Sequence, residues 1–552
     1  MTDLRETRRE QMFPKLTPAQ IGRLDAYGKR MHIRAGEVLA EPGDRYGRLL
    51  AVLSGAIDIV LPGIAGETLL TVHTAGDFAG EMSALRGAGA SVRARVREDG
   101  EVIAIERDDL RRLVQADADL SELFMRAFIL RRMGLISAEQ GDVILIGSSH
   151  SADTLRVRQF LGRNSFPYVS VDVDRDADVA ALLERFHVGV DEVPVVVCRG
   201  EAVLRNPTNE RLAECLRMNP EIDDATVRDL IVIGAGPAGL AAAVYGASEG
   251  LDVLVLESTA PGGQAGTSSK IENYLGFPTG ISGQALAGRA AVQAQKFGAD
   301  VAVASTVGRL LCHRRPYRIE LSSGRVVHAR TIVVATGAEY RPLAIENLSR
   351  FVGEGVYYAA TYLEAQICKG EEIIVVGGGN SAGQAAVFLA SACRHVHLLV
   401  RSSGLAATMS RYLIRRIEDS PNITLRPYTE IAALHGNGRL QQVRWRSGAN
   451  AVAETREIEH VFLMTGAVPN TRWLEGWVAL DDKGFVRTGP DLRPEDLAAT
   501  RWPLSRMPHL VETSRPGIFA VGDVRAGSVK RVAAAVGEGS ACVQFVHRAL
   551  QE

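Results

Sequence analysis

Residues Leu230–Glu257, LIVIGAGPAGLAAAVYGASEGLDVLVLE, decide the fold of this 552-residue chain. An apolar run from Leu230 to Ile233 is followed by a glycine-rich turn, an alanine-rich segment and a second apolar run that ends at Glu257. This pattern predicts a β–α–β unit of the kind that binds dinucleotides. A membrane span would also explain the uncharged residues up to Ser248, but three glycines and a proline inside the run argue against a span.

The residues of the turn each have a mechanical role. Gly234 permits the tight turn, Gly236 lets the backbone approach a pyrophosphate, and Gly239 allows the helix to pack closely on the strand. Pro237 stands in the same turn, before a helix whose free N–H groups and dipole favour a bound phosphate. Glu257 follows the last glycine by roughly 20 residues, where a carboxylate can hold ribose hydroxyls.

A second stretch of the same design lies at Glu372–Val400. The residues of its turn are Gly377, Gly379, Asn380, Ser381 and Ala382. The strand that follows leads to Arg401 and not to a carboxylate. A missing acid and a present arginine suit a 2′-phosphate, so this second site is expected to prefer NADPH to NADH.

Further motifs accompany the two turns. Ile332–Gly337 (IVVATG) and Ile518–Asp523 (IFAVGD) are strand ends, and Gly262–Gln264 and Ile271–Tyr274 (IENY) lie between the two turns. In this order and spacing, the motifs resemble the low-molecular-weight thioredoxin reductase family over Arg228–Glu552. By that resemblance, the flavin contacts come from Gly263, Gln264, Asn273, Thr336, Gly337, Gly522 and Asp523.

The resemblance implies an α/β protein with two Rossmann-like domains, one for FAD and one for NADPH. The FAD domain would be split into residues 229–342 and 467–552 around an NAD(P)H domain at 343–466, with crossings near Tyr340–Leu343 and Gly466–Asn470. Asp523 would accept hydrogen bonds from the ribityl chain of the flavin. The helix from about Lys530 would direct its positive end at a reduced flavin ring. The resemblance also leads us to expect a homodimer.

One departure decides the function. The family carries a CxxC pair upstream of the nicotinamide glycines, and its thiols pass electrons from the flavin to a protein disulfide. The matching stretch here is YYAATY, with Ala359 and Tyr362 at the two cysteine positions, so the catalytic residues are unknown. Cys368 follows but has no close partner in sequence, and we consider only Cys393 as one, because both flank the second turn.

Three functions therefore remain open. The first is an enzyme that passes electrons from NADPH through the flavin directly to a small oxidant, a quinone, dioxygen or a redox protein. The second is a regulatory flavoprotein whose flavin and nucleotide occupancy report redox state without sustained turnover. The third is a thioredoxin-disulfide reductase that uses other cysteines.

Residues 1–138 predict a β jelly roll followed by helices. Alternating runs lie at Arg34–Asp44 and Leu50–Val60, and Leu110–Leu135 is amphipathic. The segment GDFAGEMSAL (residues 76–85) resembles the phosphate cassette of cyclic-nucleotide-binding domains, which implies a ribose contact at Glu81. The arginine that clamps the phosphate in that family is missing at Gly89 and Ala90, and Arg93 is expected to face the opposite side. A cyclic nucleotide is thus a doubtful ligand, and a fold that has lost its ligand is the alternative.

Residues 141–218 predict a smaller α/β unit that resembles thioredoxin and glutaredoxin folds. Gly147-Ser148-Ser149-His150 leads into a helix, and Val193-Pro194 matches the cis-proline position of those folds. Ser151–Thr154 occupies the dithiol position, so thiol exchange is not expected. The serines before the helix either bind an anion or cap it. Residues 219–228 are expected to be a linker.

Composition sets the remaining bounds. The length indicates three or four domains, and 46% hydrophobic and 23% charged residues are typical of a soluble globular protein. A net charge of −2 gives no hint of a nucleic-acid or membrane partner. The six cysteines have no metal-ligand spacing and the charged start is no secretory signal, so free thiols in a cytoplasmic protein are expected. Pro490–His509, with four prolines, is expected to form a surface loop or lid.

Overall fold

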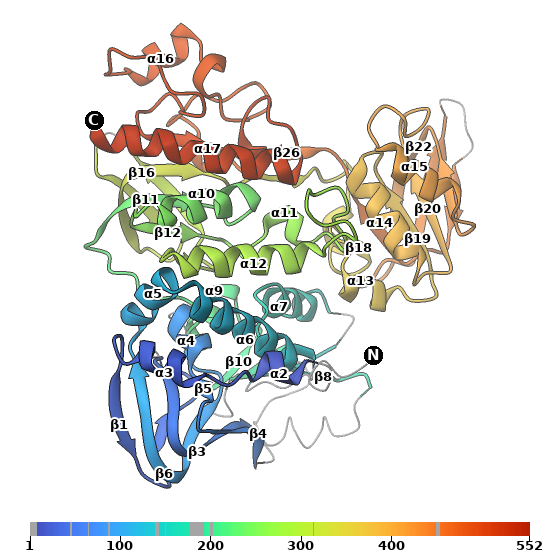
Figure 1. Cartoon of the computed structure of the whole chain (residues 1–552). Coiled ribbons are helices and arrows are strands. Elements are labelled where there is room, and N and C mark those ends of the chain that lie inside the picture. The colour runs from blue at the N-terminus through green and yellow to red at the C-terminus, as the bar shows by residue number, and fades with distance from the viewer. Residues whose placement is uncertain are drawn as a thin grey trace.

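The computed structural model describes residues 8–44, 47–63, 66–86, 89–137, 143–148, 151–175, 192–198, 202–312, 314–448 and 453–552. Figure 1 shows a β-rich N-terminal domain below, a small α/β unit above and behind it, a split α/β domain at the top, and a further α/β domain to the right. The small unit contacts the split domain, and the N-terminal domain also contacts it directly, because Arg107 and Arg111 of the N-terminal domain pair with Asp300 at 3.3 and 3.2 Å.

The N-terminal domain is an antiparallel sheet closed by helices, as the sequence predicts. Its strands are β1 (Lys29–Ile33), β2 (Val38–Ala40), β3 (Leu49–Gly63), β4 (Gly66–Thr74), β5 (Phe78–Ala79) and β6 (Arg93–Ile105). They pair in the order β1-β6-β3-β4, with β2 on β6 and β5 on β3. The helices are α2 (Arg9–Met12), α3 (Pro18–Leu24), α4 (Glu81–Arg86), α5 (Arg107–Ala116) and α6 (Ala118–Ser137). The predicted amphipathic stretch is broken at Asp117, which separates α5 from α6.

The small unit contains β7 (Val143–Gly147), α7 (Ala152–Arg163), β8 (Val169–Asp172), β9 (Val195–Cys198), β10 (Ala202–Arg205) and α9 (Asn209–Cys215). Its sheet has the order β10-β9-β7-β8, in which only β7 and β8 run parallel. The Val193–Pro194 peptide is cis. This arrangement is compatible with the expected thioredoxin-like fold, which stays a prediction, and Ser149 and His150 lie outside the described residues.

The split domain is built on the stretch that opened the sequence analysis. Its sheet contains β11 (Val227–Ile233), β12 (Val253–Leu256), β13 (Asp300–Ala302), β14 (Val307–Leu311), β15 (Tyr317–Leu321), β16 (Val326–Val334) and β27 (Ile518–Ala520). The order is β13-β12-β11-β16-β15-β14, with β27 on β16. Strands β12, β11 and β16 are parallel and buried on both faces, which explains their continuous apolar runs.

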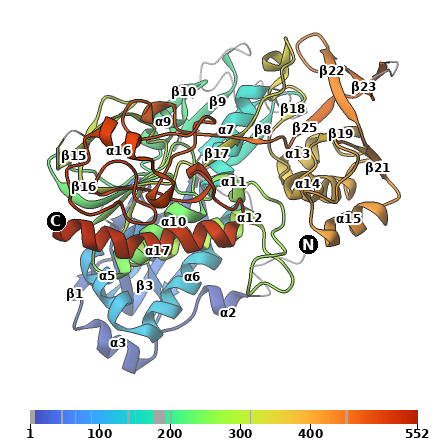
Figure 2. The same ribbon diagram turned by 90° about the horizontal axis from the view of Figure 1, so that it is seen from above.

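Helices α10 (Pro237–Ser248), α12 (Gly283–Lys296) and α17 (Val532–Gln551) cover one face of this sheet, and α10 and α17 lie side by side in Figures 1 and 2. Small residues allow the two helices to touch, since a Cβ on Gly539 would lie 2.0 Å from the carbonyl oxygen of Ala238. The alanines of α10 are therefore a packing surface and no membrane span. Among the described helices, none is long and apolar enough to cross a membrane.

The predicted linker is shorter than residues 219–228. Strand β11 begins at Val227 and pairs with β16 from that residue, so it includes the last two linker positions. Asn219 is also fastened, because its side chain donates to the carbonyl of Val303 and accepts from the N–H of Val303, both at 2.8 Å. The connection is thus part of the fold.

The further α/β domain has a parallel sheet with the order β18-β25-β19-β20-β21. Its elements are β18 (Val356–Tyr357), α13 (Tyr362–Ile367), β19 (Glu372–Val376), α14 (Asn380–Ala390), β20 (His395–Leu399), α15 (Arg411–Glu418), β21 (Ile423–Arg426) and β25 (His460–Leu463). A small sheet of β22 (Thr429–His435), β23 (Gln442–Ser447) and β24 (Glu454–Arg456) packs on it. Strands β17 (Ala338–Tyr340) and β26 (Ala467–Pro469) pair where the two crossings were expected.

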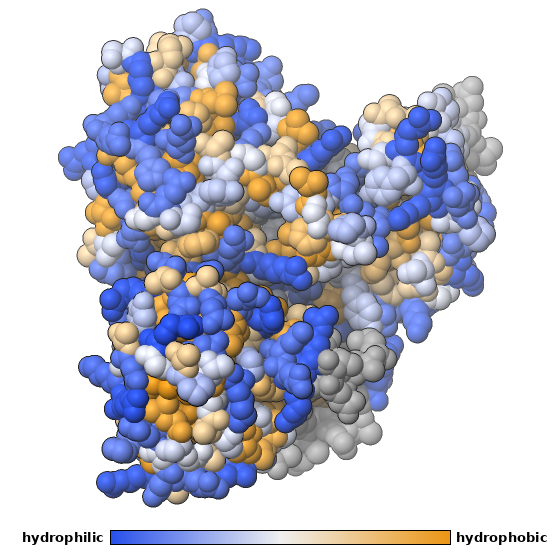
Figure 3. Space-filling view, in the orientation of Figure 1, coloured by the Kyte–Doolittle hydropathy of each residue, from blue (hydrophilic) through white to orange (hydrophobic). Residues whose placement is uncertain are grey.

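The segment 490–509 is more ordered than the expected loop. It begins within the 3-10 turn η4 (Gly489–Asp491) and contains helix α16 (Pro494–Thr500). Arg506 then donates to the fully buried carboxylate of Glu512 at 2.7 Å and to Glu552 near the C-terminus at 2.7 Å. On the face of the molecule shown in Figure 3, polar and apolar side chains are interspersed.

Gly239→Ala is expected to destabilise the split domain. Its Cβ would lie 1.9 Å from the carbonyl oxygen of Gly234 and 3.2 Å from the Cβ of Ala335, so backbone must move. Overpacking of this kind costs about 1–3 kcal/mol or more, which thermal unfolding of the flavin-free chain would register as an earlier transition. The matched control is Gly288→Ala in α12, where nothing lies within 4 Å and alanine should stabilise the helix slightly. Equal unfolding temperatures for the two variants would contradict the packing role of Gly239.

Candidate active site

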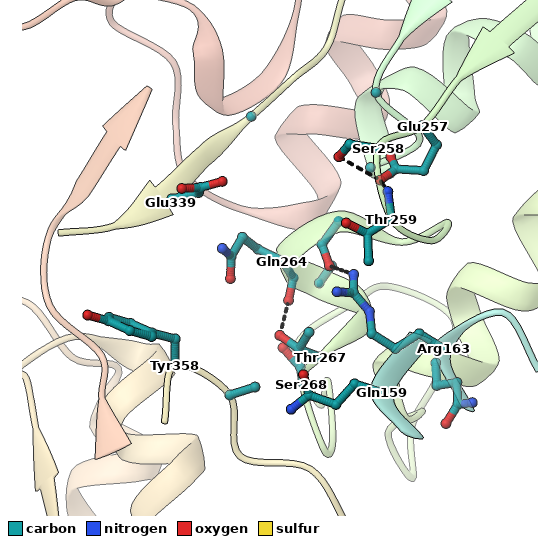
Figure 4. A pocket seen from close by; sticks show the side chains of 18 of the residues that line it. Gln159, Arg163, Glu257, Ser258, Thr259, Gln264, Thr267, Ser268, Glu339 and Tyr358 are labelled. Atoms are coloured by element: carbon teal, nitrogen blue, oxygen red, sulfur yellow. Dashed lines mark hydrogen bonds between the residues drawn. The ribbon is translucent and has the colours of Figure 1, made fainter. Parts of the chain in front are cut away.

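A cavity of about 1390 Å³ opens where the split domain, the further α/β domain and the small unit meet. The predicted cofactor residues that line it are Gly234, Gly236, Pro237, Glu257, Gly263, Gln264, Asn273, Thr336, Gly337, Asn380, Ser381, Gly522 and Asp523. They come from both nucleotide turns and from both halves of the split domain. Figure 4 shows how Glu257, Gln264 and their neighbours surround the empty space.

Three helices longer than one turn begin at this cavity without a side-chain cap. The N-cap residues are Gly236 for α10, Gly379 for α14 and Arg531 for α17, and none accepts a hydrogen bond from the first turn of its helix through a side chain. The residues just inside each start, among them Pro237, Asn380 and Val532, line the cavity. Unsatisfied N–H groups and the positive end of the dipole make each start suitable for an anion.

The first turn leaves room for such an anion. A Cβ on Gly236 would meet only the Cα of Gly263, at 3.9 Å, so the space in front of α10 is open. Gly234 has a positive φ of 101°, and a Cβ there would lie 2.4 Å from the carbonyl oxygen of Ala335. Turn geometry and open space therefore fall on the two glycines for which the sequence predicts them, and the pyrophosphate of FAD fits this cradle.

The second turn repeats the arrangement. Gly377 has a φ of 144°, and a Cβ there would lie 2.3 Å from the carbonyl oxygen of Met464. A Cβ on Gly379 would have nothing within 4 Å, while Ala382 is fully buried against the sheet. Arg401 follows β20 with an exposed side chain, and no hydrogen bond or ion pair to it occurs among the described residues. Its guanidinium is thus available to a 2′-phosphate.

Glu257 is held by the backbone of the loops around it. Its side chain is 7% exposed, and its two carboxylate oxygens accept the N–H groups of Ala235 at 2.7 Å and Thr259 at 2.9 Å. The hydroxyl of Ser258 also donates to Glu257, at 3.4 Å. A carboxylate has about four acceptor positions, so about one remains for a ribose hydroxyl. The bonds orient Glu257 toward the cavity that it lines (Figure 4).

The C-terminal strand end supplies a second carboxylate. Burial raises the pKa of Asp523, which lies in the 3-10 turn η5 (Gly522–Val524). Lys530 donates to the carbonyl oxygen of Asp523 at 2.6 Å, and burial lowers the pKa of Lys530. Helix α17 begins two residues later, at Val532, so its positive end faces the cavity as the sequence predicts.

The two positions that would carry the CxxC cysteines also line the cavity. Ala359 and Tyr362 both lie on its wall, and Ala360 between them forms a β-bridge with Ser268. The Tyr362 side chain is 71% exposed. No cysteine is among the described residues that line the cavity. The described part of the cavity wall at these two positions therefore offers an alanine and a tyrosine and no thiol.

Cys368 and Cys393 do meet, but in the core of the further α/β domain. Their sulfur atoms are 3.4 Å apart, and the two residues are 0% and 6% exposed. The hydrogen bond with Cys393 and burial both raise the pKa of the Cys368 thiol. A buried, protonated thiol is a poor nucleophile for disulfide exchange.

The cassette of the N-terminal domain is occupied by the chain itself. Glu81 is 1% exposed and forms an ion pair of 2.9 Å with Arg131 of α6. Arg93 is paired with Glu41 at 2.9 Å and also with Glu67. The carboxylate expected to meet a ribose and the nearest spare cation are thus both engaged within the domain.

Helix α7 is the part of the site that the sequence does not predict. Among the lining residues that it contributes are Leu155, Gln159 and Arg163. Its N-terminus does not serve as an anion site, because the hydroxyl of Ser151 accepts from Thr154 and the N–H of Ala152 donates to Glu354 at 2.6 Å. Of the two roles considered for this serine, capping is the one observed.

The comparisons with known proteins agree with this arrangement. The sequence profile of the family described as pyridine nucleotide-disulphide oxidoreductase matches residues 228–539, and that of the cyclic nucleotide-binding domain matches residues 30–117. The NADPH-dependent thioredoxin reductase 3 of Arabidopsis thaliana is 32% identical over 359 residues, which are 62% of this chain. The match covers 63% of that relative, so this chain spans less than two thirds of its length.

Two further relatives are matched over nearly their whole length. The thioredoxin reductase of Bacillus subtilis is 29% identical over 332 residues, 60% of this chain and 97% of its own. The crystal structure of Lactococcus lactis thioredoxin reductase has a TM-score of 0.52 at 26% identity, and the match covers 59% of this chain and 99% of that one. The N-terminal domain and the small unit precede the segment that the oxidoreductase profile matches.

Gly236→Val is expected to give a folded chain that purifies with little flavin. The φ of −70° at Gly236 is allowed for valine and the nearest atom is 3.9 Å from a Cβ, so the side chain enters the cradle without straining the fold. Flavin absorbance per chain measures the loss. Gly379→Val is the matched control, since it blocks the second turn and should retain flavin while weakening NADPH binding. A Gly236→Val protein with full flavin would contradict the assignment of the first turn.

Proposed function

We propose that this chain, which belongs to the pyridine nucleotide-disulphide oxidoreductase family, delivers electrons to its acceptor without a thiol relay. Membership of the family makes it an NAD(P)H-dependent flavoprotein oxidoreductase with sites for FAD and NADPH. The observation that carries the proposal is at the cavity wall. Ala359 and Tyr362 stand where the relay cysteines of the resembling family would stand, and no cysteine is among the described lining residues.

The residues around the cavity have separate binding roles in this proposal. The N–H groups at the start of α10 hold the pyrophosphate of FAD, Glu257 its ribose, and Asp523 its ribityl chain. The start of α14 and Arg401 hold NADPH, in line with the name of the Arabidopsis relative. When bound, FAD supplies the redox chemistry of the site, which is uptake of a hydride from the nicotinamide and transfer of the electrons to the acceptor.

The acceptor is a molecule that can reach the cavity directly. A small oxidant, a quinone, dioxygen or a redox protein fits this requirement, because none of them needs a thiolate on this chain. Thioredoxin disulfide does need one, together with a second thiol that resolves the mixed disulfide. The contact between Cys368 and Cys393 offers two sulfurs, but burial keeps them from an external disulfide.

A regulatory flavoprotein without sustained turnover is the second candidate. One observation favours it: Arg132 of α6 donates to the carbonyl oxygens of Asn164 and Ser165, directly after α7. Asn164 in turn donates to the carbonyl of Thr259, at 3.1 Å, beside the first nucleotide turn. The N-terminal domain thus contacts the flavin cavity through one intervening segment.

We also propose that residues 141–218 are a thioredoxin-like domain without thiol chemistry, and that the chain forms a homodimer.

NADPH is expected to reduce the flavin at lower concentration than NADH. Arg401 is exposed and unpaired among the described residues, and a hydrogen bond to a charged group contributes about 1.5–3 kcal/mol, or about ten- to a hundredfold in affinity. Arg401→Ala should remove most of the preference in titrations followed by flavin bleaching. Arg394→Ala is the control, since Arg394 precedes β20 and Arg401 follows it at the opposite end. Equal affinities in the parent protein would refute the assignment.

Steady-state NADPH oxidation should be sustained when a quinone or dioxygen is the acceptor. The protein should not reduce thioredoxin. Cys368→Ser should behave as the parent protein in both assays, because its thiol is buried away from the cavity. Added cyclic AMP is expected to leave the rate unchanged, since Glu81 is paired with Arg131. Thioredoxin reduction that Cys368→Ser abolishes would establish a hidden relay. A single stoichiometric flavin reduction with every acceptor would favour the regulatory role.

A further inference from the structure

Helix α7 forms a wall of the flavin cavity although it belongs to another unit of the chain. Gln159 donates to the buried carboxylate of Glu364 at 2.7 Å, which fixes the middle of the helix to the further α/β domain. At the other end, the side chain of Gln284 donates to the carbonyl oxygen of Gly162 at 2.6 Å. The last turn of α7 is therefore docked on the split domain, next to the first nucleotide turn.

Arg163, the last residue of α7, directs its guanidinium into this cavity (Figure 4). One nitrogen donates to the carbonyl oxygen of Gly263 at 3.2 Å, and no carboxylate within ion-pair distance is found among the described residues. A guanidinium has five N–H donors, so most of its hydrogen-bonding capacity is unused. Burial lowers the pKa of Arg163, while the nearby carboxylates of Glu257 and Glu364 act to raise it, so the cost of burial is only partly offset.

The position of Arg163 indicates which anion would be its partner. Gly263 lies against the first turn, since a Cβ on Gly263 would be 3.1 Å from the Cα of Gly236. The guanidinium on Gly263 thus lies on the same rim of the cavity as the open N-terminus of α10. The carboxylate of Glu257 is already held by backbone N–H groups. A phosphate group at the start of α10 would complete both the helix terminus and the arginine.

We propose that Arg163 binds the pyrophosphate of FAD, so that a domain outside the matched oxidoreductase segment supplies part of the flavin site. The inference rests on the proposed FAD site at the first turn. It gives the small unit a function that needs no thiol: it presents a cation at the end of α7 and covers the cavity. Arginine suits this role because its planar fork can form two hydrogen bonds with a phosphate.

Arg163→Ala is expected to weaken FAD binding by about tenfold or more, as for the loss of a charge-assisted hydrogen bond. The full-length apoprotein is titrated with FAD, and binding is followed by quenching of flavin fluorescence. Arg163→Lys, which keeps the charge without the fork, should lie between the parent and the alanine variant. Thermal unfolding without FAD should be the same for all three proteins, and the stabilisation by FAD should be smallest for Arg163→Ala.

Arg132→Ala is the matched control. Arg132 donates to the carbonyls of Asn164 and Ser165, so it fastens the same end of α7 without itself lining the cavity. Its removal should leave the affinity for FAD close to that of the parent. Unchanged affinity in Arg163→Ala would overturn the inference, and an equal loss in Arg132→Ala would assign the effect to docking and overturn it too. A parent protein that does not bind FAD would instead refute the proposed function itself.

Discussion

The structure depends on one constraint: at three helix N-termini the free N–H groups have no side-chain acceptor and need an anion. Helices α10, α14 and α17 all begin at one cavity, and none has a side chain that accepts its first N–H groups. Other helices have a local cap, as α12 has in Ser282 and α3 has in Thr17. At the cavity, glycine replaces the capping residue on α10 and α14 and leaves both the donors and the space to a ligand. Helix α17, from the C-terminal part of the split domain, begins at the same cavity as α10 from its first part.

The sequence predicts those parts of the fold and site that are encoded by local spacing. The turns at Gly234 and Gly377 could be predicted because the strand–turn–helix unit around each of them requires a glycine with a positive φ at that position. The paired crossings between the domains follow from the same order of motifs. The exact bounds of the elements could not be predicted in the same way. Strand β11 begins inside the predicted linker, and a helix lies in the proline-rich segment 490–509. In these places sheet pairing and buried ion pairs override the local composition.

Contacts between distant segments account for what the sequence could not supply. Arg163 reaches Gly263 across 100 positions, and Arg131 reaches Glu81 across 50. Neither pair has a spacing that marks it. For Glu81 the consequence is chemical, because its motif indicates a ribose contact while the fold gives the carboxylate a buried arginine. Removing one member of a buried ion pair costs about 3–5 kcal/mol, so a nucleotide would have to offer more than a hydroxyl to displace Arg131.

The N-terminus of α7 is engaged by contacts within the chain. At the start of α7, Ser151 caps the helix, and the N–H of Ala152 is occupied by Glu354. That end is also closed by contact, because a Cβ on Gly353 would lie 2.8 Å from the Cβ of Ala152. Both ends of the helix line the cavity, since Ala152 and Arg163 are among its lining residues, and the end at Arg163 brings a guanidinium to it.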